Sequence, residues 1–142
     1  MKGRCVRAKK KILVPIDGTE RSMHSLEFIK GIFDKDSVDI EIMNVKELVF
    51  IDGISLSEEI KNSEALGRKI LDKAEEIMEG YNVSVYFTFG YPGDEIIRKA
   101  KEDDIDIIVM TKSTKKGLTR MIGSVTASVV KQAKCIVMIV PE

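Results

Sequence analysis

Residues 12–20 read Ile12-Leu13-Val14-Pro15-Ile16-Asp17-Gly18-Thr19-Glu20, a short apolar run that ends abruptly in an acidic, glycine-containing turn. A run that is apolar on both faces is typical of a strand buried on both sides, as in a parallel sheet. Polar residues directly after such a strand lie at its carboxyl end, where open parallel sheets bind ligands. We therefore interpret this stretch as the first strand and as one wall of a candidate site.

Four more apolar runs follow, at Val38–Val45, Val83–Phe89, Ile105–Met110 and Cys135–Val140. The last two are apolar on both faces and predict strands buried on both sides, whereas the run at 83–89 alternates and favours a strand near an edge. Helical spacing separates the runs, as at Leu26, Ile29 and Phe33. Strict alternation of strand and helix predicts a single α/β domain with one open five-stranded parallel sheet and helices on both faces.

Residues at the ends of the helical segments give further local predictions. Ser55 and Ser124 are expected to cap the helices that follow them, because a serine hydroxyl accepts hydrogen bonds from first-turn amides. Pro92 and the acidic residues after it predict a helix start. Gly80 stands where a helix would end in a glycine. The longest break, residues 46–56, is expected to be a loop.

Composition and charge narrow the class of protein. The chain has 142 residues, of which 44% are hydrophobic and 32% are charged, and its 23 basic residues balance 23 acidic ones. A balanced globular chain has no overall field to attract nucleic acid or a membrane surface. No apolar run approaches the roughly 20 residues of a membrane span. We therefore expect a cytoplasmic protein without nucleic-acid or membrane partners, with residues 1–10 as a basic tail and 11–142 as the domain.

Catalytic signatures are not found in the sequence. His24 is the only histidine, and it falls on the first predicted helix, away from the strand ends. No Ser/His or Cys/His pair, metal-ligand cluster or Gly-x4-Gly-Lys-(Ser/Thr) phosphate loop is present. A phosphoacceptor domain would need an aspartate at the end of the third strand, where Phe89 and Gly90 stand. These observations predict a protein that is not an enzyme and has no metal site of its own.

The segment from Thr111 to Ser124 is basic and rich in hydroxyl groups, and it ends in Gly123-Ser124 at a predicted helix start. Free amides and the dipole at a helix N-terminus attract phosphate. The alternative is a solvated basic loop with a glycine turn and a serine cap. Spacing alone leaves both interpretations open.

Several stretches in order make the chain resemble the universal stress protein family from Lys11 to Val140. They are 11–20 as opening strand and acidic turn, 90–97 with its Gly-x-Pro, 107–110 with the loop to Gly123-Ser124-Val125, and 135–141 as final strand. The resemblance implies a Rossmann-like sheet of order 3-2-1-4-5 with two helices on each face. The residues by themselves leave order 2-1-3-4-5 open. The family resemblance also implies a stress-response or signalling homodimer whose two chains pair through the strand Cys135–Val140.

Nucleotide-binding members of that family carry Gly-x2-Gly-x9-Gly-(Ser/Thr), from which this chain departs. Thr111 and Thr114 replace the first two glycines, and the spacer before Gly123 is one residue short. Threonine resists the positive φ that glycine accepts. The resemblance nevertheless implies an ATP or AMP site, with Mg²⁺ as a companion of ATP. The residues carried over are Asp17, Val45, Met110, Thr111, Thr114, Gly123, Ser124 and Val125. The alternative is a member that binds no nucleotide and acts as a protein-interaction module.

Overall fold

The structure is a computed structural model that describes residues 9–48, 52–112 and 123–141. In chain order the elements are β1 (Lys10–Pro15), α1 (Glu20–Ile32), β2 (Val38–Lys46), α2 (Leu56–Ile77), β3 (Asn82–Phe89), α3 (Pro92–Glu102), β4 (Ile107–Thr111), α4 (Ser124–Gln132) and β5 (Ile136–Val140). They form one sheet of order β3-β2-β1-β4-β5 in which every pair is parallel. The α/β class and the order implied by the family resemblance are both confirmed.

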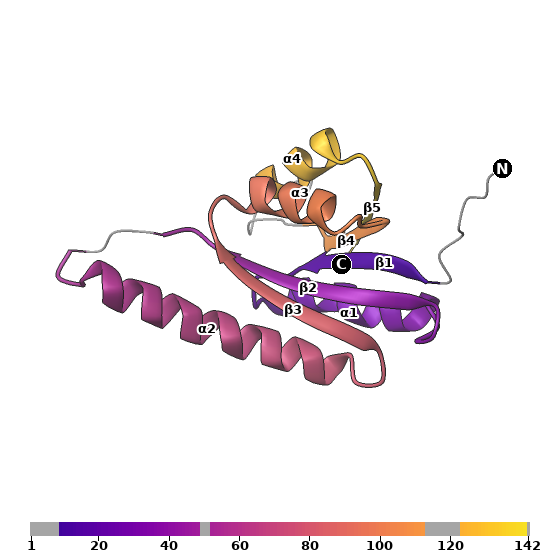
Figure 1. Ribbon diagram of the computed structural model, residues 1–142, viewed down its shortest axis with the longest axis horizontal. Coiled ribbons are helices and arrows are strands. Elements are labelled where there is room, and N and C mark those ends of the chain that lie inside the picture. Colours follow the sequence, from indigo (N-terminus) through magenta and orange to yellow (C-terminus); the bar gives the residue numbers. More distant parts are fainter. Residues whose placement is uncertain (1–8, 49–51, 113–122, 142) are drawn as a thin grey trace.

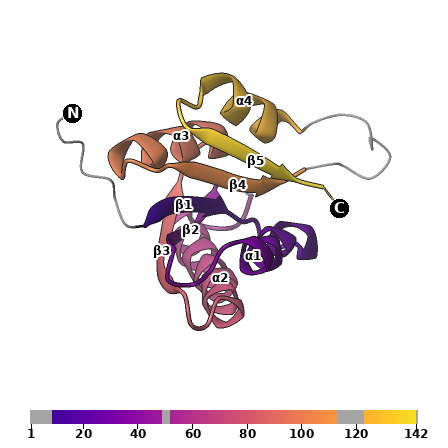
Figure 2. The same cartoon turned by 90° about the vertical axis from the view of Figure 1, so that its right-hand side faces the viewer.

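Helices cover both faces of this sheet (Figures 1 and 2). Alternate residues of β1 point to opposite sides, so Ile12 and Val14 pack with α1 and α2 while Leu13 packs with α3 and α4. All three side chains are fully buried. The uninterrupted apolar run in β1 therefore follows from its place in the middle of a sheet with two hydrophobic cores.

The two edge strands differ from the central ones. β3 is an edge strand, as its alternating pattern predicts. The expectation that the run at 135–140 is buried on both sides is wrong for the single chain, because β5 is the opposite edge and Ile136 at its start is 61% exposed. β5 contacts both hydrophobic cores, through Met138 and Val140 on one face and Val137 on the other, but of its residues only Val140 is buried.

Helix ends test the capping predictions. Ser55 caps α2, its Oγ accepting from the Glu58 N–H at 3.2 Å, and α3 begins at Pro92 as predicted. Gly80 has φ +95° in the turn after α2. The prediction that Ser124 caps α4 is wrong: Gly123 is the N-cap, and Ser124 is the first helical residue. Glycine and serine both occur at N-cap positions, so the sequence Gly-Ser does not tell which of the two residues is the N-cap.

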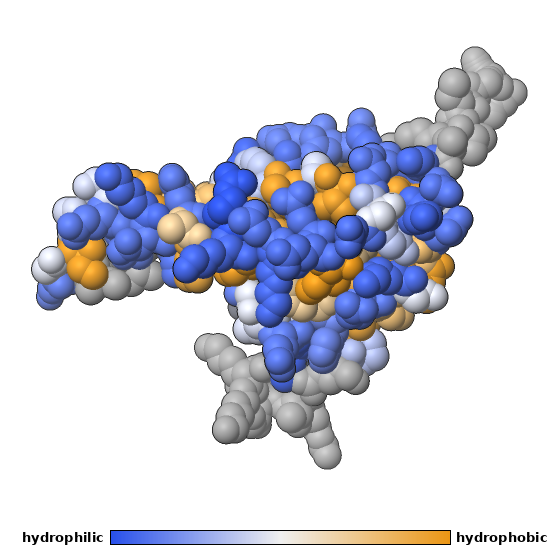
Figure 3. Space-filling view, turned by 90° about the horizontal axis from the view of Figure 1, so that it is seen from below, coloured by the Kyte–Doolittle hydropathy of each residue, from blue (hydrophilic) through white to orange (hydrophobic). Residues whose placement is uncertain are grey.

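The longest helix, α2, projects beyond the sheet at its N-terminal end (Figure 1). Viewed from below, in Figure 3, hydrophilic residues dominate the outer surface, with smaller hydrophobic patches between them. No helix in the described parts of the chain is long and apolar enough to span a membrane.

Candidate functional site

A cavity of about 180 Å³ lies at the carboxyl end of the sheet, on the side covered by α3 and α4. Its walls come from the carboxyl ends of β1, β2 and β4 and from the N-terminal parts of α1, α3 and α4. The described lining residues are Pro15, Ile16, Asp17, Ser22, Val45, Pro92, Ile96, Met110, Thr111, Val125 and Thr126. The chain turns from β1 toward β2 on one side and reaches β4 on the other, so the cavity lies where the strand order reverses. This is the usual ligand position in an open parallel sheet.

The turn after β1 holds Asp17 in a defined position. Its Oδ1 accepts hydrogen bonds from the Thr19 N–H at 3.0 Å and the Thr19 hydroxyl at 2.6 Å, and its N–H donates to Ser22 Oγ at 3.2 Å. Gly18 bridges the two residues with φ +87°, a value that glycine adopts at little cost. Shielding from water acts to raise the pKa of Asp17, but the hydrogen bonds with Thr19 and Ser22 outweigh it and keep that pKa below its usual value. The turn therefore favours the ionised form of this carboxylate at the wall of the cavity.

The carboxyl end of β1 is braced from β2. The buried Asn44 side chain donates through Nδ2 to the Ile16 carbonyl at 2.9 Å, and the Ile16 N–H donates to the Met43 carbonyl at 2.9 Å. These bonds extend the pairing of the two strands one residue past the end of β1. The rigid end of β1 thus fixes the place from which the Asp17 turn starts.

Thr111 takes the first threonine position of the altered loop motif in an extended conformation. It is the last residue of β4, pairs with Val140 of β5, and is half-buried at the cavity wall. Asp104 is the only described non-glycine residue with a positive φ, so Thr111 needs no conformation that its branched side chain resists. Where the family motif has a glycine without a side chain, Thr111 places a hydroxyl group that can donate or accept a hydrogen bond.

The start of α4 meets the same cavity. Val125 and Thr126, in its first turn, line the wall, while Gly123 and Ser124 lie just before them. Gly123 has no side chain with which to cap the first amides of α4. The first amides of α4 have no side-chain cap among the described residues, and the positive dipole end of the helix lies beside the cavity.

Five of the eight predicted site residues line this one cavity: Asp17, Val45, Met110, Thr111 and Val125. Gly123 and Ser124 lie beside it at the helix start, and Thr114 falls outside the described residues. Their assembly at one place is a fact of the fold. Their role as nucleotide contacts stays a prediction.

Six of the eleven described lining residues were not predicted as site residues: Pro15, Ile16, Ser22, Pro92, Ile96 and Thr126. Pro92 had been interpreted as a helix start only, and no sequence pattern separates an isoleucine such as Ile96 that lines a cavity from one that fills a core. Thr126 is different, because it is fully buried and its hydroxyl has no hydrogen-bond partner among the described residues. A buried hydroxyl without a hydrogen bond lowers the free energy of unfolding, so stability alone does not account for a threonine at this place.

Comparison with protein families explains this arrangement. The model of the universal stress protein family matches residues 9–141, nearly the whole chain. The chain belongs to the universal stress protein family. A curated relative, universal stress protein MJ0531 of Methanocaldococcus jannaschii, is 31% identical over 144 residues, which cover 94% of this chain and 82% of the relative.

Two solved universal stress proteins with a ligand share the fold. One, described as a complex with cAMP, is 24% identical, has a TM-score of 0.64 and is matched over 94% of this chain and 97% of its own. The other, the Arabidopsis thaliana family protein At3g01520 with AMP bound, is 19% identical, has a TM-score of 0.65 and is matched over 94% and 92%.

Elsewhere in the described residues, little resembles a catalytic centre. His24 is exposed on α1, on the helix where the sequence placed it, and no group of three or more His, Cys, Asp or Glu side chains there could hold a metal ion.

Proposed function

We propose that this universal stress protein binds an adenine nucleotide, ATP or AMP, in the cavity at the β1–β4 switch point and acts in the cytoplasm as a stress-response or signalling dimer without a catalytic site. The observation that carries the proposal is the cavity itself. It brings together the Asp17 carboxyl group, whose pKa is lowered, several apolar side chains, and a helix N-terminus that has no side-chain cap among the described residues.

The chemistry of the wall fits the parts of a nucleotide. Val45, Met110 and Val125 offer apolar surface to a flat base, and Asp17 offers an acceptor to ribose hydroxyls. The volume is below the roughly 300–1,000 Å³ of drug-sized sites. Only the base and ribose would therefore be enclosed, and the phosphates would extend toward Gly123 and the first amides of α4.

The cAMP and AMP complexes support the choice of ligand class, since both neighbours hold an adenine mononucleotide on this fold. Mg²⁺ would accompany ATP rather than bind alone. Asp17 is the one carboxylate among the described lining residues, and Mg²⁺ typically takes one or two carboxylates together with phosphate oxygens.

Isothermal titration calorimetry of ATP and AMP, with and without Mg²⁺, tests the proposal. Asp17→Asn should weaken binding about tenfold or more, because a hydrogen bond to a charged group contributes roughly 1.5–3 kcal/mol. Asp36→Asn is the matched control: that exposed aspartate precedes β2, at the opposite end of the strands, and its change should leave affinity unaltered. Absence of binding at millimolar concentration of either nucleotide would overturn the proposal.

A protein-interaction module is the second candidate function, and exposed hydrophobic side chains favour it. Leu48 and Tyr91, 38% and 69% exposed, border a second hollow with Phe89 next to the β2–α2 connection. Ile136 on the edge strand is the site at which a dimer partner would pair. Failure of nucleotide binding together with a retained dimer would favour this function.

A further inference from the structure

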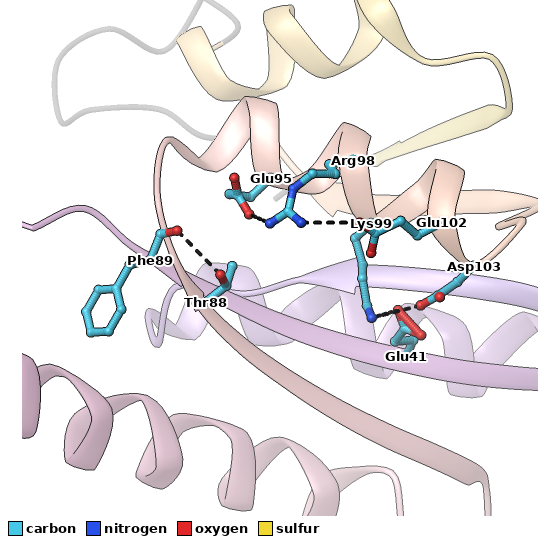
Figure 4. A network of polar contacts seen from close by, with 8 residues as sticks. All are labelled: Glu41, Thr88, Phe89, Glu95, Arg98, Lys99, Glu102 and Asp103. Atoms are coloured by element: carbon cyan, nitrogen blue, oxygen red, sulfur yellow. Dashed lines mark hydrogen bonds and ion pairs between the residues drawn. The ribbon is translucent and has the colours of Figure 1, made fainter.

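A second polar cluster lies beneath α3, away from the cavity. Glu41 of β2 is directed toward Lys99 of α3 and toward Asp103, the C-cap of that helix (Figure 4). Lys11 of β1 and Tyr86 of β3 lie beside them. Glu41 and Lys99 side chains are 18% and 17% exposed. The cluster therefore places two carboxyl groups on a largely covered face of the sheet.

The distances show that Asp103, not Glu41, receives the direct partners. Lys99 Nζ lies 3.0 Å from Asp103 Oδ2 but 3.9 Å from Glu41 Oε2, and it also lies 4.0 Å from the centre of the Tyr86 ring. Lys11 Nζ donates to the Asp103 main-chain carbonyl at 2.8 Å. Glu41 Oε2 is buried and has no hydrogen-bond partner among the described residues.

An ionised Glu41 would leave that oxygen unsatisfied beside a second carboxylate. Ionised carboxylates only accept hydrogen bonds, so two of them can bond to each other only if one carries a proton. Burial, followed by the hydrogen bond with Asp103, raises the pKa of Glu41 to about 7, although Lys99 and Lys11 act against the rise. The same hydrogen bond from Glu41, with that from Lys99, lowers the pKa of Asp103. Of the two carboxyl groups, Glu41 is therefore the one that favours the protonated form below about pH 7.

We propose that a proton on Glu41, donated to the Asp103 carboxylate, fastens α3 to the sheet and makes the docking of this helix sensitive to pH near neutrality. The other end of α3 carries Pro92 and Ile96, which line the cavity. Loss of the proton would leave two facing carboxylates under the helix and loosen the wall of the cavity. The effect on the ligand site rests on the proposed function, whereas the effect on stability does not.

Other charged groups around the cluster are engaged elsewhere. Arg98 of α3 pairs with Glu95 and Glu102, on the exposed side of the helix (Figure 4). On the strands, Asp39 contacts Lys9 and Asn82, and Asp106 accepts from the Lys11 N–H. The Glu41–Asp103 pair is therefore the group in this region with the chemistry to change charge close to pH 7.

The sign of the effect follows from linkage. The folded state keeps the Glu41 proton up to about pH 7, while the unfolded chain loses it near the ordinary value of 4.5. Between these values the unfolded state binds fewer protons, so stability falls as pH rises and levels off above pH 7.

Thermal unfolding from pH 5 to pH 8 tests the proposal. The wild-type melting temperature should fall across this range, and Glu41→Gln, whose amide is permanently neutral and can donate to Asp103, should flatten the profile. Glu102→Gln, an exposed acid on the same helix, is the control and should follow the wild type. Equal slopes for wild type and Glu41→Gln would overturn the proposal. If Glu41→Gln does not fold, ¹³C NMR titration of the wild-type Glu41 carboxyl decides instead, and an apparent pKa below 5 would overturn it.

AMP affinity at pH 6 and pH 8 tests the coupling to the cavity. The phosphate of AMP also titrates near pH 6, so the readout is the difference between wild type and Glu41→Gln. We expect affinity to fall several-fold more in the wild type than in the variant. If AMP affinity changes equally with pH in both proteins, the Glu41 proton is not coupled to the cavity. If AMP does not bind at any pH, the proposed function fails, and the unfolding profile still tests the proton.

Discussion

At the scale of single residues, the site combines positions that sequence patterns can find with one that they cannot. Asp17 follows directly after an apolar strand, so its place at the carboxyl end of the sheet was predictable. Thr126 lies within a helix where a threonine carries no distinctive signal, and only the packed structure shows its hydroxyl buried without a partner. Ser124 was misjudged as a cap because glycine and serine are both acceptable N-cap residues.

Thr126→Val should stabilise the free protein by about 1 kcal/mol. The change keeps the branched shape and removes a buried hydroxyl that lacks a hydrogen bond, and such an unsatisfied group costs roughly 1–3 kcal/mol. Urea unfolding of the ligand-free protein measures it. A loss of stability would show that the hydroxyl has a partner in solution, such as a bound water.

The Asp17 turn should lose stability in acid. Because the folded pKa of Asp17 is lowered, the ionised form is favoured by the fold above the ordinary pKa near 3.8, and that contribution disappears as pH falls below it. Thermal unfolding between pH 5 and pH 3 of the wild type and Asp17→Asn measures the effect. The variant should have the shallower acid profile, and parallel profiles would contradict the hydrogen-bonded turn.

At the scale of elements, strand and helix identities were predictable because hydrophobic periodicity depends on local burial. The degree of exposure of β5 was not, since an apolar run does not tell a central strand from an edge strand with one partner. The close packing of one element against another could not be predicted from the sequence either. Gly67 of α2 lies against the Phe87 ring of β3 and near Asn44 of β2, where a Cβ atom would overlap the ring.

Gly67→Ala should destabilise the protein by about 1–3 kcal/mol, because overpacking would push α2 from the sheet and outweigh the better helix propensity of alanine. Gly31→Ala in α1 is the matched control. Apart from the neighbouring residues and the backbone of α1 itself, nothing lies within 4 Å of its added Cβ, so it should stabilise by about 0.5–1 kcal/mol. Urea unfolding of both variants measures the contrast, and two changes of the same sign would contradict the close packing of α2.

At the scale of the whole molecule, the residues predicted an open parallel sheet but not its strand order. Orders 3-2-1-4-5 and 2-1-3-4-5 need the same elements and the same right-handed crossovers. They differ in whether β3 lies beyond β2 or between β1 and β4, a choice made by packing between distant segments. The family resemblance resolved it, and the position of the cavity between β1 and β4 depends on that order.

The proposed dimer through β5 gives a whole-molecule prediction. An apolar edge strand with Ile136 exposed is prone to pair with a second strand, and a lysine on such an edge opposes pairing. Ile136→Lys should shift the protein from dimer to monomer in size-exclusion chromatography with light scattering. Ile32→Lys, at a comparably exposed isoleucine at the end of α1, should not. A dimer that survives Ile136→Lys would locate the interface elsewhere.

The most direct test of the nucleotide site is a titration of the ¹⁵N-labelled protein with AMP or ATP, followed by two-dimensional NMR. Our account predicts saturable shifts centred on Asp17, Val45, Met110, Thr111 and Val125, with the hollow beside Cys135 at the far end of α4 unaffected. An unchanged spectrum at millimolar nucleotide, or shifts centred away from the β1–β4 crevice, would contradict it.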